Sequence, residues 1–271
     1  MVDISQLRTM QNDARTLADD LGVVTIDLTD KELTRFGRSF ARQFIVQSPT
    51  KEIMEVYLRH QKEALLGGMI AKQIMNAEVD DEIPASNKIG GPIPIRAPYL
   101  GIGYDWEDIR GIYGLLAQNQ WTTGAPQPWI HSGTTLMGGT RWNPIRIGTN
   151  AVHVIWGIGD INPAPKMEAM QFTVDGKQKP IIYNAWAWKQ APVLTQLFKE
   201  FDNAFILKKD TTFLASVLYS ANFGGPSAFV TDYPVLWGVS FIKEPVMRLQ
   251  DPVTGAGRLL PGITYDTIFA T

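Results

Sequence analysis

Residues 170–182 read MQFTVDGKQKPII and carry the strongest local fold signal in this sequence. Apolar and polar residues alternate up to Val174, and Asp175-Gly176 then supplies the dipeptide that favours a tight β-hairpin turn. Residues 179–188 (KPIIYNAWAW) provide a returning strand. The segment therefore predicts an antiparallel hairpin, and we expect this part of the chain to form a β-sheet.

Short apolar segments flank this hairpin on both sides. Residues 145–158 alternate apolar with small or polar side chains, which predicts a strand. Residues 205–207 and 211–219 predict a second hairpin around a turn at 208–210. Residues 235–242 (VLWGVSFI) form a continuous apolar run, which is expected of a strand that is buried on both faces or is central to a sandwich.

Weaker segments complete the predicted β region. Residues 93–95 and 99–104 are poorer strand candidates because proline restricts a strand to the edge of a sheet, and residues 194–201 predict a short helix. Seven or eight short strands with Pro- and Gly-rich connections are typical of a two-sheet antiparallel sandwich of jelly-roll or related Greek-key type. The predicted fold class is mainly β, jelly-roll-like, with an α-helical N-terminal region.

The composition of the chain changes sharply near residue 83. Residues 1–83 hold 24 charged residues, one proline and four glycines, whereas residues 84–271 hold the other 16 prolines, 20 glycines and all eight tryptophans. A charge-rich segment almost free of proline and glycine can form helices, and frequent proline and glycine leave only short strands and loops. We therefore predict a helical N-terminal arm or subdomain at 1–83 and a β-sandwich body at 84–271, with long loops and a C-terminal tail.

Three amphipathic helices are predicted within the first 83 residues. Apolar residues recur every three or four positions between residues 4 and 21, before a stop at Gly22. Residues 29–32 (TDKE) form a capping-box pattern that opens the second helix. The third helix begins at Ser-Pro and runs over residues 48–75, with Gly67-Gly68 as a weak point.

The overall totals exclude several classes of protein. The 271 residues carry a net charge of −2 and no cysteine, which excludes disulfide bonds, thiolate metal sites and a surface that coats nucleic acid throughout. An apolar content of 45% excludes a mostly disordered chain. The N-terminus lacks the pattern of a signal peptide, and no apolar run approaches the roughly 20 residues that span a bilayer, so neither segment is predicted.

The three histidines do not form a metal-binding pattern. A metal centre needs three or four converging ligands, and the spacing of His60, His131 and His153 supplies none. We expect His60 to pair with Glu63 on a helix surface and His153 to be a partly buried or sheet-face residue of a strand. His131 stands in the loop context most favourable to a site. The sequence predicts no metal and no cofactor.

Motifs for catalysis are sparse. No serine lies in Gly-x-Ser-x-Gly, and residues 101–106 lack the third glycine of a dinucleotide-binding loop. Asp105, Glu107 and Asp108 match the paired carboxylates of a glycoside hydrolase. The same residues also fit the start of a helix, with Asp105 as its cap, and we favour the cap.

Tryptophan side chains are the main candidates for an interface or a ligand. These residues are Trp121, Trp129, Trp142, Trp186 and Trp188. The first three lie in a stretch at 118–144 that predicts a long surface loop, and the last two share one face of a predicted strand. Aromatic rings stack on sugars, but they are also enriched at subunit interfaces, and we favour an interface.

A candidate basic face lies on the second predicted helix. Arg35, Arg38 and Arg42 recur at three- and four-residue spacing. Such a face is suited to nucleic acid or anionic lipid. The alternative is a solvated helix surface whose arginines pair with Asp30 and Glu32, and three arginines do not decide between the two.

The order of these features resembles that of jelly-roll coat proteins of icosahedral viruses and phages. Residues 170–182, 211–219 (TTFLASVLY) and 235–242 are similar to the back half of such a barrel, and the resemblance covers roughly residues 90–245. It lies in the strand pattern, so it carries over no functional residue. It implies a structural role in a virion shell, with loops at subunit contacts and the N-terminal arm facing inward or bridging neighbours.

One feature departs from many coat proteins. A coat protein that touches its genome often has a strongly basic tail, whereas residues 1–83 carry 10 Lys+Arg against 14 Asp+Glu. A shell that overlies an internal membrane or another protein layer therefore fits this chain better than direct packaging of the genome.

The sequence therefore predicts a self-assembling structural protein, a viral capsid subunit without enzymatic activity. Its expected partners are copies of itself and other virion proteins, with an internal membrane or nucleic acid as further contacts of the arm and no small-molecule substrate. Its expected location is the virion, assembled in the host cytoplasm. Two alternatives stay open: a carbohydrate-binding module or lectin that uses the loop tryptophans, and a glycoside-acting hydrolase that uses Asp105 with Glu107 or Asp108.

Overall fold

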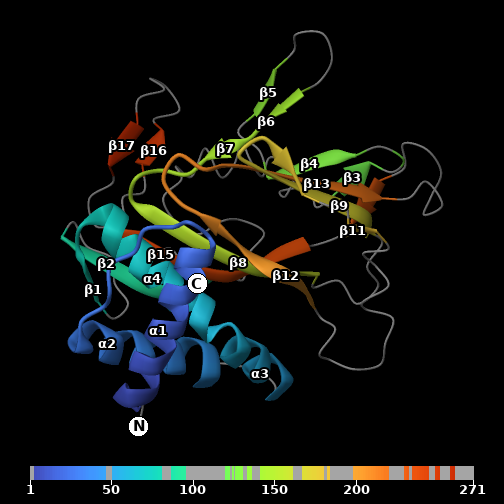
Figure 1. Ribbon diagram of the computed structural model, residues 1–271. Coiled ribbons are helices and arrows are strands. Elements are labelled where there is room, and N and C mark those ends of the chain that lie inside the picture. Colours follow the sequence, from blue (N-terminus) through green and yellow to red (C-terminus); the bar gives the residue numbers. More distant parts are fainter. Residues whose placement is uncertain are drawn as a thin grey trace.

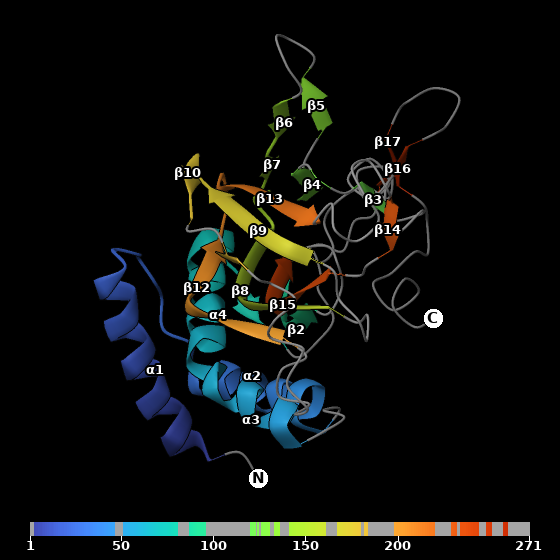
Figure 2. The same cartoon turned by 90° about the vertical axis from the view of Figure 1, so that its right-hand side faces the viewer.

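Two β-sheets lie face to face, and helices cover the outer face of one of them, in a computed structural model of the chain (Figure 1). Figure 2 shows the layers from the side, in the order helices, five-stranded sheet and six-stranded sheet. The structure describes residues 3–46, 51–80, 87–95, 120–122, 124, 126–130, 133–135, 141–160, 167–179, 182–183, 198–219, 229–231, 234–243, 248–250 and 257–259.

The helical layer follows the predicted pattern with one break. Its elements are α1 (Ile4–Asp20), α2 (Asp30–Phe40), a π-helix η1 (Ala41–Val46), α3 (Lys51–Arg59) and α4 (Gln61–Met75). Gly22 ends the first helix with a φ of 63°, and Thr29 and Glu32 form the predicted capping box. The prediction of one continuous helix up to residue 75 is wrong, because α3 ends before His60 and α4 begins after it.

The first sheet has five strands and is antiparallel except at one edge. In spatial order the strands are β1 (Glu78–Val79), β2 (Lys88–Ile95), β15 (Pro234–Lys243), β8 (Ala151–Asp160) and β12 (Phe198–Leu207). Among the strands that the structure describes, only the short β1 pairs in parallel, with β2. The prolines at 92 and 94 therefore lie close to the β1 edge of the sheet, as expected for residues that cannot donate to a ladder.

The second sheet has six strands. Its main path is β10 (Lys177–Gln178), β9 (Met167–Val174), β13 (Thr212–Tyr219) and β4 (Gln127–Ile130), with β11 (Ile182–Tyr183) beside β9 and β7 (Ile145–Arg146) beside β13. Three two-stranded ladders join β3 (Gln120–Thr122) to β14 (Phe229–Thr231), β5 (Gly133–Thr135) to β6 (Arg141–Asn143), and β16 (Arg248–Gln250) to β17 (Gly257–Leu259).

Two apolar cores hold the three layers together. One lies between the sheets and includes Ile155, Phe172 and Phe213. The other lies between the helices and the five-stranded sheet and includes Phe40 and Phe241. The structure therefore has a β-sandwich-like body and a helical N-terminal region. The core beneath the helices includes side chains from both the helices and the five-stranded sheet. The division of the chain at residue 83 stays a prediction.

The predicted hairpin at 170–182 is confirmed at its turn. Asp175 and Gly176 have φ angles of 49° and 72°, as a type I′ turn requires, and β9 pairs with β10 on either side. The continuous apolar run at 235–242 is also confirmed as a buried strand, since β15 lies between β2 and β8 and both of its faces meet a core.

Three local predictions are wrong. The segments around 208–210 do not pair with each other: β12 belongs to the first sheet and β13 to the second. The backbone N–H of Asp210 donates to Ile147, which turns the chain across the sandwich instead of back on itself. Residues 145–158 divide between β7 and β8 in different sheets, and residues 198–201 are strand where a helix was expected.

Gly67 and Gly68 have a packing role in place of the predicted weak point. Helix α4 continues through both residues and lies against β8 and β15. A Cβ added at Gly67 would lie 2.6 Å from Cγ2 of Val154 and 3.0 Å from Cε2 of Phe241. The absence of a side chain therefore lets the helix approach the sheet closely.

We predict that Gly67→Ala destabilises the protein although alanine is the better helix former. Overpacking costs about 1–3 kcal/mol, and helix propensity returns only about 1 kcal/mol. Urea unfolding followed by circular dichroism measures the difference. Gly148→Ala is the control, because nothing lies within 4 Å of a Cβ there. A stabilised Gly67→Ala variant would contradict the close approach, and Val154→Ala is expected to relieve the cost.

Candidate functional site

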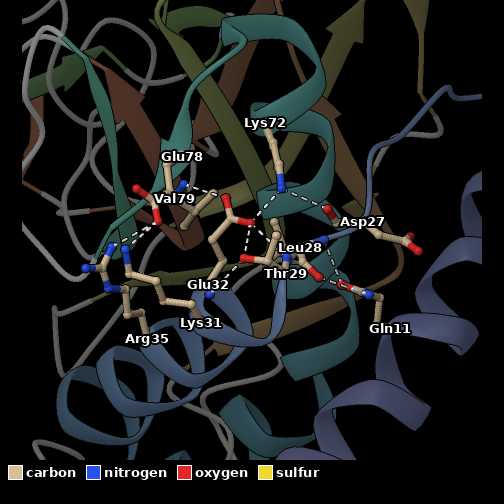
Figure 3. Close-up of polar contacts among 10 residues, drawn as sticks. All are labelled: Gln11, Asp27, Leu28, Thr29, Lys31, Glu32, Arg35, Lys72, Glu78 and Val79. Carbon is tan, nitrogen blue, oxygen red and sulfur yellow. Dashed lines mark hydrogen bonds and ion pairs between the residues drawn. The ribbon is translucent and has the colours of Figure 1, made fainter.

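A buried carboxylate organises the junction of α2, α4 and β1. Glu32 is 1% exposed, and its Oε2 accepts hydrogen bonds from the Thr29 backbone at 2.8 Å, the Thr29 hydroxyl at 2.8 Å and Lys72 Nζ at 2.5 Å (Figure 3). Its Oε1 accepts the backbone N–H of Val79 at 3.0 Å. Both carboxylate oxygens are thus bound by the protein itself.

These contacts keep Glu32 charged inside the fold. Burial raises the pKa of Glu32, but the hydrogen bonds from Lys72, Thr29 and Val79 outweigh burial and leave the pKa below its usual range. Lys72 also donates to the carbonyl of Asp27 at 3.0 Å. The pair therefore ties the α1–α2 connection to α4 and β1.

Helix α1 joins the same network through Gln11. Its side chain accepts from the backbone N–H of Leu28 at 2.9 Å and donates to the Leu28 carbonyl at 3.4 Å (Figure 3). A hollow of about 350 Å³ lies beside the network and is lined by Ile26, Thr29, Glu32, Lys72, Asn76, Ala77 and Glu78. Because Glu32 and Lys72 neutralise each other, the network stabilises the helix layer and presents no unbalanced charge to a ligand.

The three arginines of the candidate basic face differ in exposure, since Arg35 is partly buried. Arg35 Nη1 lies 3.6 Å from Glu78 of β1 (Figure 3). It also lies 3.0 Å from Asp80, directly after this strand, so it ties α2 to β1. Arg38 and Arg42 are exposed. The expected partners of these arginines bind elsewhere, since Asp30 pairs with Arg8 and Glu32 with Lys72.

The structure places three of the candidate tryptophans on strands. Trp121 lies in β3 opposite Val230, Trp129 lies in β4, and Trp142 lies in β6 opposite Thr134. The predicted long loop at 118–144 therefore contains strands β3, β4, β5 and β6, and the loop prediction is wrong for the residues of these strands. Trp186, Trp188, Asp105, Glu107, Asp108 and His131 lie outside the described residues.

Two histidines have surroundings that sequence reasoning did not find. His60 keeps its expected neighbour Glu63, but its ring is nearly buried, stacks on Trp156 and contacts Glu200. Glu200 is 140 positions away, so no local spacing predicts the contact. Among the residues that the structure describes, no group of three His, Cys, Asp or Glu side chains is placed to hold a metal.

His153 lies on β8 and is fully buried, where a partly buried or sheet-face position was expected. Its Nδ1 is 2.7 Å from the hydroxyl of Ser240 on the adjacent strand, and its Nε2 meets no hydrogen-bond partner among the described residues. Burial lowers the pKa of His153 from its usual 6.5 to about 4. The imidazole is therefore neutral at pH 7, and this position places no charge in the core.

Comparisons with known proteins place the chain in no established family. No family model matches, and no curated protein matches. Its similarity to solved structures is low, with TM-scores of 0.23 for an insecticidal delta-endotoxin from Bacillus thuringiensis (15% identity), 0.19 for a family 35 carbohydrate-binding module from Clostridium thermocellum (12%), and 0.19 for a cycloisomaltooligosaccharide glucanotransferase from Paenibacillus sp. (12%).

These matches differ in how much they cover. The match with the toxin spans 60% of this chain and 26% of the toxin. The match with the module spans 46% of this chain and 89% of the module, and the match with the glucanotransferase spans 70% of this chain and 22% of that enzyme. The chain thus corresponds to about a quarter of the toxin. At TM-scores of 0.19–0.23, these matches assign neither a family nor a function to the chain. None of the described helices is long and apolar enough to cross a bilayer.

We predict that Glu32→Gln lowers the free energy of unfolding by about 3 kcal/mol, because it leaves Lys72 beside an amide and turns an NH₂ group toward backbone donors. Asp30→Asn makes the same chemical change in an exposed ion pair with Arg8 and is expected to have little effect. Urea unfolding at pH 7 measures both variants. Equal effects would show that burial of Glu32 is not what makes the contact strong.

We predict that His153 makes the protein less stable in acid. Its pKa is lower in the folded than in the unfolded chain, so the unfolded chain binds the proton more tightly between pH 6.5 and 4. The contribution of the neutral His153 to the free energy of unfolding is fully present above about pH 6.5. It falls by about 2 kcal/mol as the pH drops to 4.5. Urea unfolding at pH 7 and pH 4.5 measures this loss.

The matched variant for this test is His153→Leu combined with Ser240→Ala, which removes both polar partners. The wild type is expected to lose about 2 kcal/mol more than this variant between the two pH values. An identical loss in the two proteins would exclude His153 as the source.

Proposed function

We propose that this chain is a capsid subunit with a jelly-roll body that assembles with copies of itself into a virion shell. The strand order supports the proposal. Eight strands carry it, in chain order β2, β4, β8, β9, β11, β12, β13 and β15. They pair from the outside inward: the first with the last, the second with the seventh, the third with the sixth, and the fourth with the fifth, all antiparallel.

This nested pairing is what results when one long hairpin of strands is rolled into two facing sheets. Within one sheet, the contact of β15 with β8 joins the first and third of these pairs. Within the other sheet, the contact of β13 with β9 joins the second and fourth pairs. Jelly rolls of eight strands and two Greek keys occur in viral capsids and also in lectins. Because a fold does not by itself fix a function, the choice between these classes rests on assembly.

An exposed apolar patch supports assembly. Leu21, Val24 and Ile26, in the connection between α1 and α2, are 51%, 72% and 43% exposed. These exposed apolar residues lie within six consecutive positions and are called the apolar patch here; exposed apolar side chains of this size favour burial against a partner. We assign this patch to a contact with a second copy of the chain, since a shell requires that each subunit bind others of its kind.

The helix layer extends the proposal to other virion components. Its outer surface carries the exposed Arg38 and Arg42, which are suited to anionic groups of an internal membrane, of nucleic acid or of a neighbouring protein. The layer lies on the subunit's own sheet, so it would meet such partners as a folded surface. The proposed location is the virion.

We predict concentration-dependent assembly of the purified full chain. Mass photometry and negative-stain electron microscopy at micromolar to millimolar concentration are expected to show oligomers or shells. Val24→Glu is expected to weaken assembly by placing a charge in the patch. Gln6→Glu adds the same charge at an exposed position on α1 and is expected to leave assembly intact.

Other outcomes would favour the alternatives. A strict monomer at these concentrations would contradict the capsid proposal. A monomer that binds glycans, and loses binding on Trp121→Ala or Trp129→Ala, would instead support a carbohydrate-binding module. Turnover of a glycoside that is lost in Asp105→Asn would support the hydrolase.

A further inference from the structure

The connection between α1 and α2 carries a short run of strand-favouring residues. Residues 23–26 read VVTI, and all four side chains are β-branched, the type that is enriched in β-strands. Their exposure alternates, since Val24 and Ile26 are exposed whereas Val23 and Thr25 are partly buried. Such alternation is what a strand shows when one of its faces lies against the protein. The segment therefore has both the composition and the periodicity of a strand.

The backbone of this segment is available for pairing. No backbone hydrogen bond joins Val24, Thr25 or Ile26 to any part of the chain that the structure describes. Hydrogen bonds to the protein resume at Asp27, whose carbonyl accepts from Lys72. The N–H and C=O groups of an exposed, unpaired strand are a template on which another strand can pair.

The segment runs back along α1, with a charged residue of α1 near each of its ends. The ion pair of Arg15 with Asp27 places Arg15 beside the end of the segment. The bond from the Gly22 N–H to the carbonyl of Asp19 places Asp19 beside its start. A hollow of about 410 Å³ is lined by both of these α1 residues and by residues 22–25. One side of the segment therefore borders a hollow that holds one positive and one negative side chain.

The segment is complementary to itself when a second copy lies antiparallel to it. With Thr25 on a two-fold axis, Val24 of one copy lies opposite Ile26 of the other, so each gains an apolar cross-strand neighbour. The same axis sets residue 27 opposite residue 23, which brings Arg15 of one copy to the level of Asp19 of the other. A parallel arrangement would instead set each charge against its own kind. Charge complementarity therefore favours the antiparallel pairing.

We propose that residues 23–27 of two copies pair as an antiparallel β-ribbon about a two-fold axis at Thr25, with Arg15 facing Asp19 across the axis. The inference rests on the proposed contact of the apolar patch with a second copy, and it adds the binding mode, the register and the symmetry. A two-fold contact closes on itself, so it makes dimers, and other surfaces must join these dimers into a shell. A ribbon this short is a weak contact on its own.

Reversing the two charges tests the geometry. Arg15→Glu sets a glutamate against Asp19, and Asp19→Arg sets an arginine against Arg15, so each variant alone places like charges at both contacts of the dimer. We expect each variant to raise the Kd of the dimer about tenfold, measured by sedimentation velocity. An equal mixture of the two is expected to recover dimers, because both contacts then join opposite charges.

The outcome of the mixing experiment decides between a specific contact and a general effect of charge. Failure of the mixture to recover dimers would overturn the proposal. Arg38→Glu is the matched control, because it makes the same change in net charge at an exposed position on α2. It is expected to leave the Kd of the dimer unchanged, and a rise equal to that of Arg15→Glu would also overturn the proposal.

The register is tested with introduced thiols, because the chain contains no cysteine. Directly opposite residues of an antiparallel pair lie within reach of a disulfide, whereas diagonal neighbours do not. At equal total protein concentration, we expect Val24→Cys mixed with Ile26→Cys to form disulfide-linked dimers about tenfold faster than either variant alone. Non-reducing electrophoresis after mild oxidation measures these rates. Equal rates in the mixture and in the single variants would overturn the register.

A thiol on the proposed axis separates this inference from the capsid proposal. The Thr25→Cys variant is expected to cross-link to its own kind, whereas Thr34→Cys, at an exposed position on α2, is the control that is not. Shells whose subunits are not linked by Thr25→Cys would overturn the ribbon and leave the capsid proposal intact. Linked dimers that form no shell at any concentration would support the ribbon and contradict the capsid.

Discussion

The rest of the structure depends on the close contact between α4 and the five-stranded sheet at Phe241. The ring of this β15 residue lies where three glycines, Gly67 and Gly68 on α4 and Gly91 on β2, leave room for it. Because glycine has no Cβ, the helix and the sheet approach each other more closely than ordinary side chains permit. The sheet is thereby buried on both faces, by helices on one side and by the second sheet on the other.

Charged contacts attach the helix layer at opposite edges of that sheet. Glu32 and Lys72 bind near β1, and His60 binds Glu200 on β12, while β1 and β12 are the two ends of the strand order. Apolar packing at Phe241 holds the centre. Buried ion pairs contribute geometry more than net stability, since desolvation offsets much of their attraction. These contacts fix the helices at the two edges of the sheet, and the apolar core fixes them at its centre.

Local signals predicted much of the secondary structure. The capping box at Thr29 and the hairpin turn at Asp175 follow from residues within a few positions of each other, and both are present. The turn at 208–210 shows the limit of such signals. Its composition indicates a turn, but the bond from Asp210 to Ile147 sends the chain to the other sheet. The surroundings of His60 had no local signal, because Glu200 lies 140 positions away.

The sequence by itself determined that the first 75 residues are mostly helical, where most strands of the two large sheets lie, and that residues 235–242 form a buried strand. These properties belong to a segment and its own periodicity, so they can be recognised without a partner. Only the tertiary structure decided which strands pair, why Gly67 and Gly68 are glycine, and which side chains surround Glu32, His60 and His153. Those outcomes depend on contacts between residues that are distant along the chain, which form only when the layers pack together.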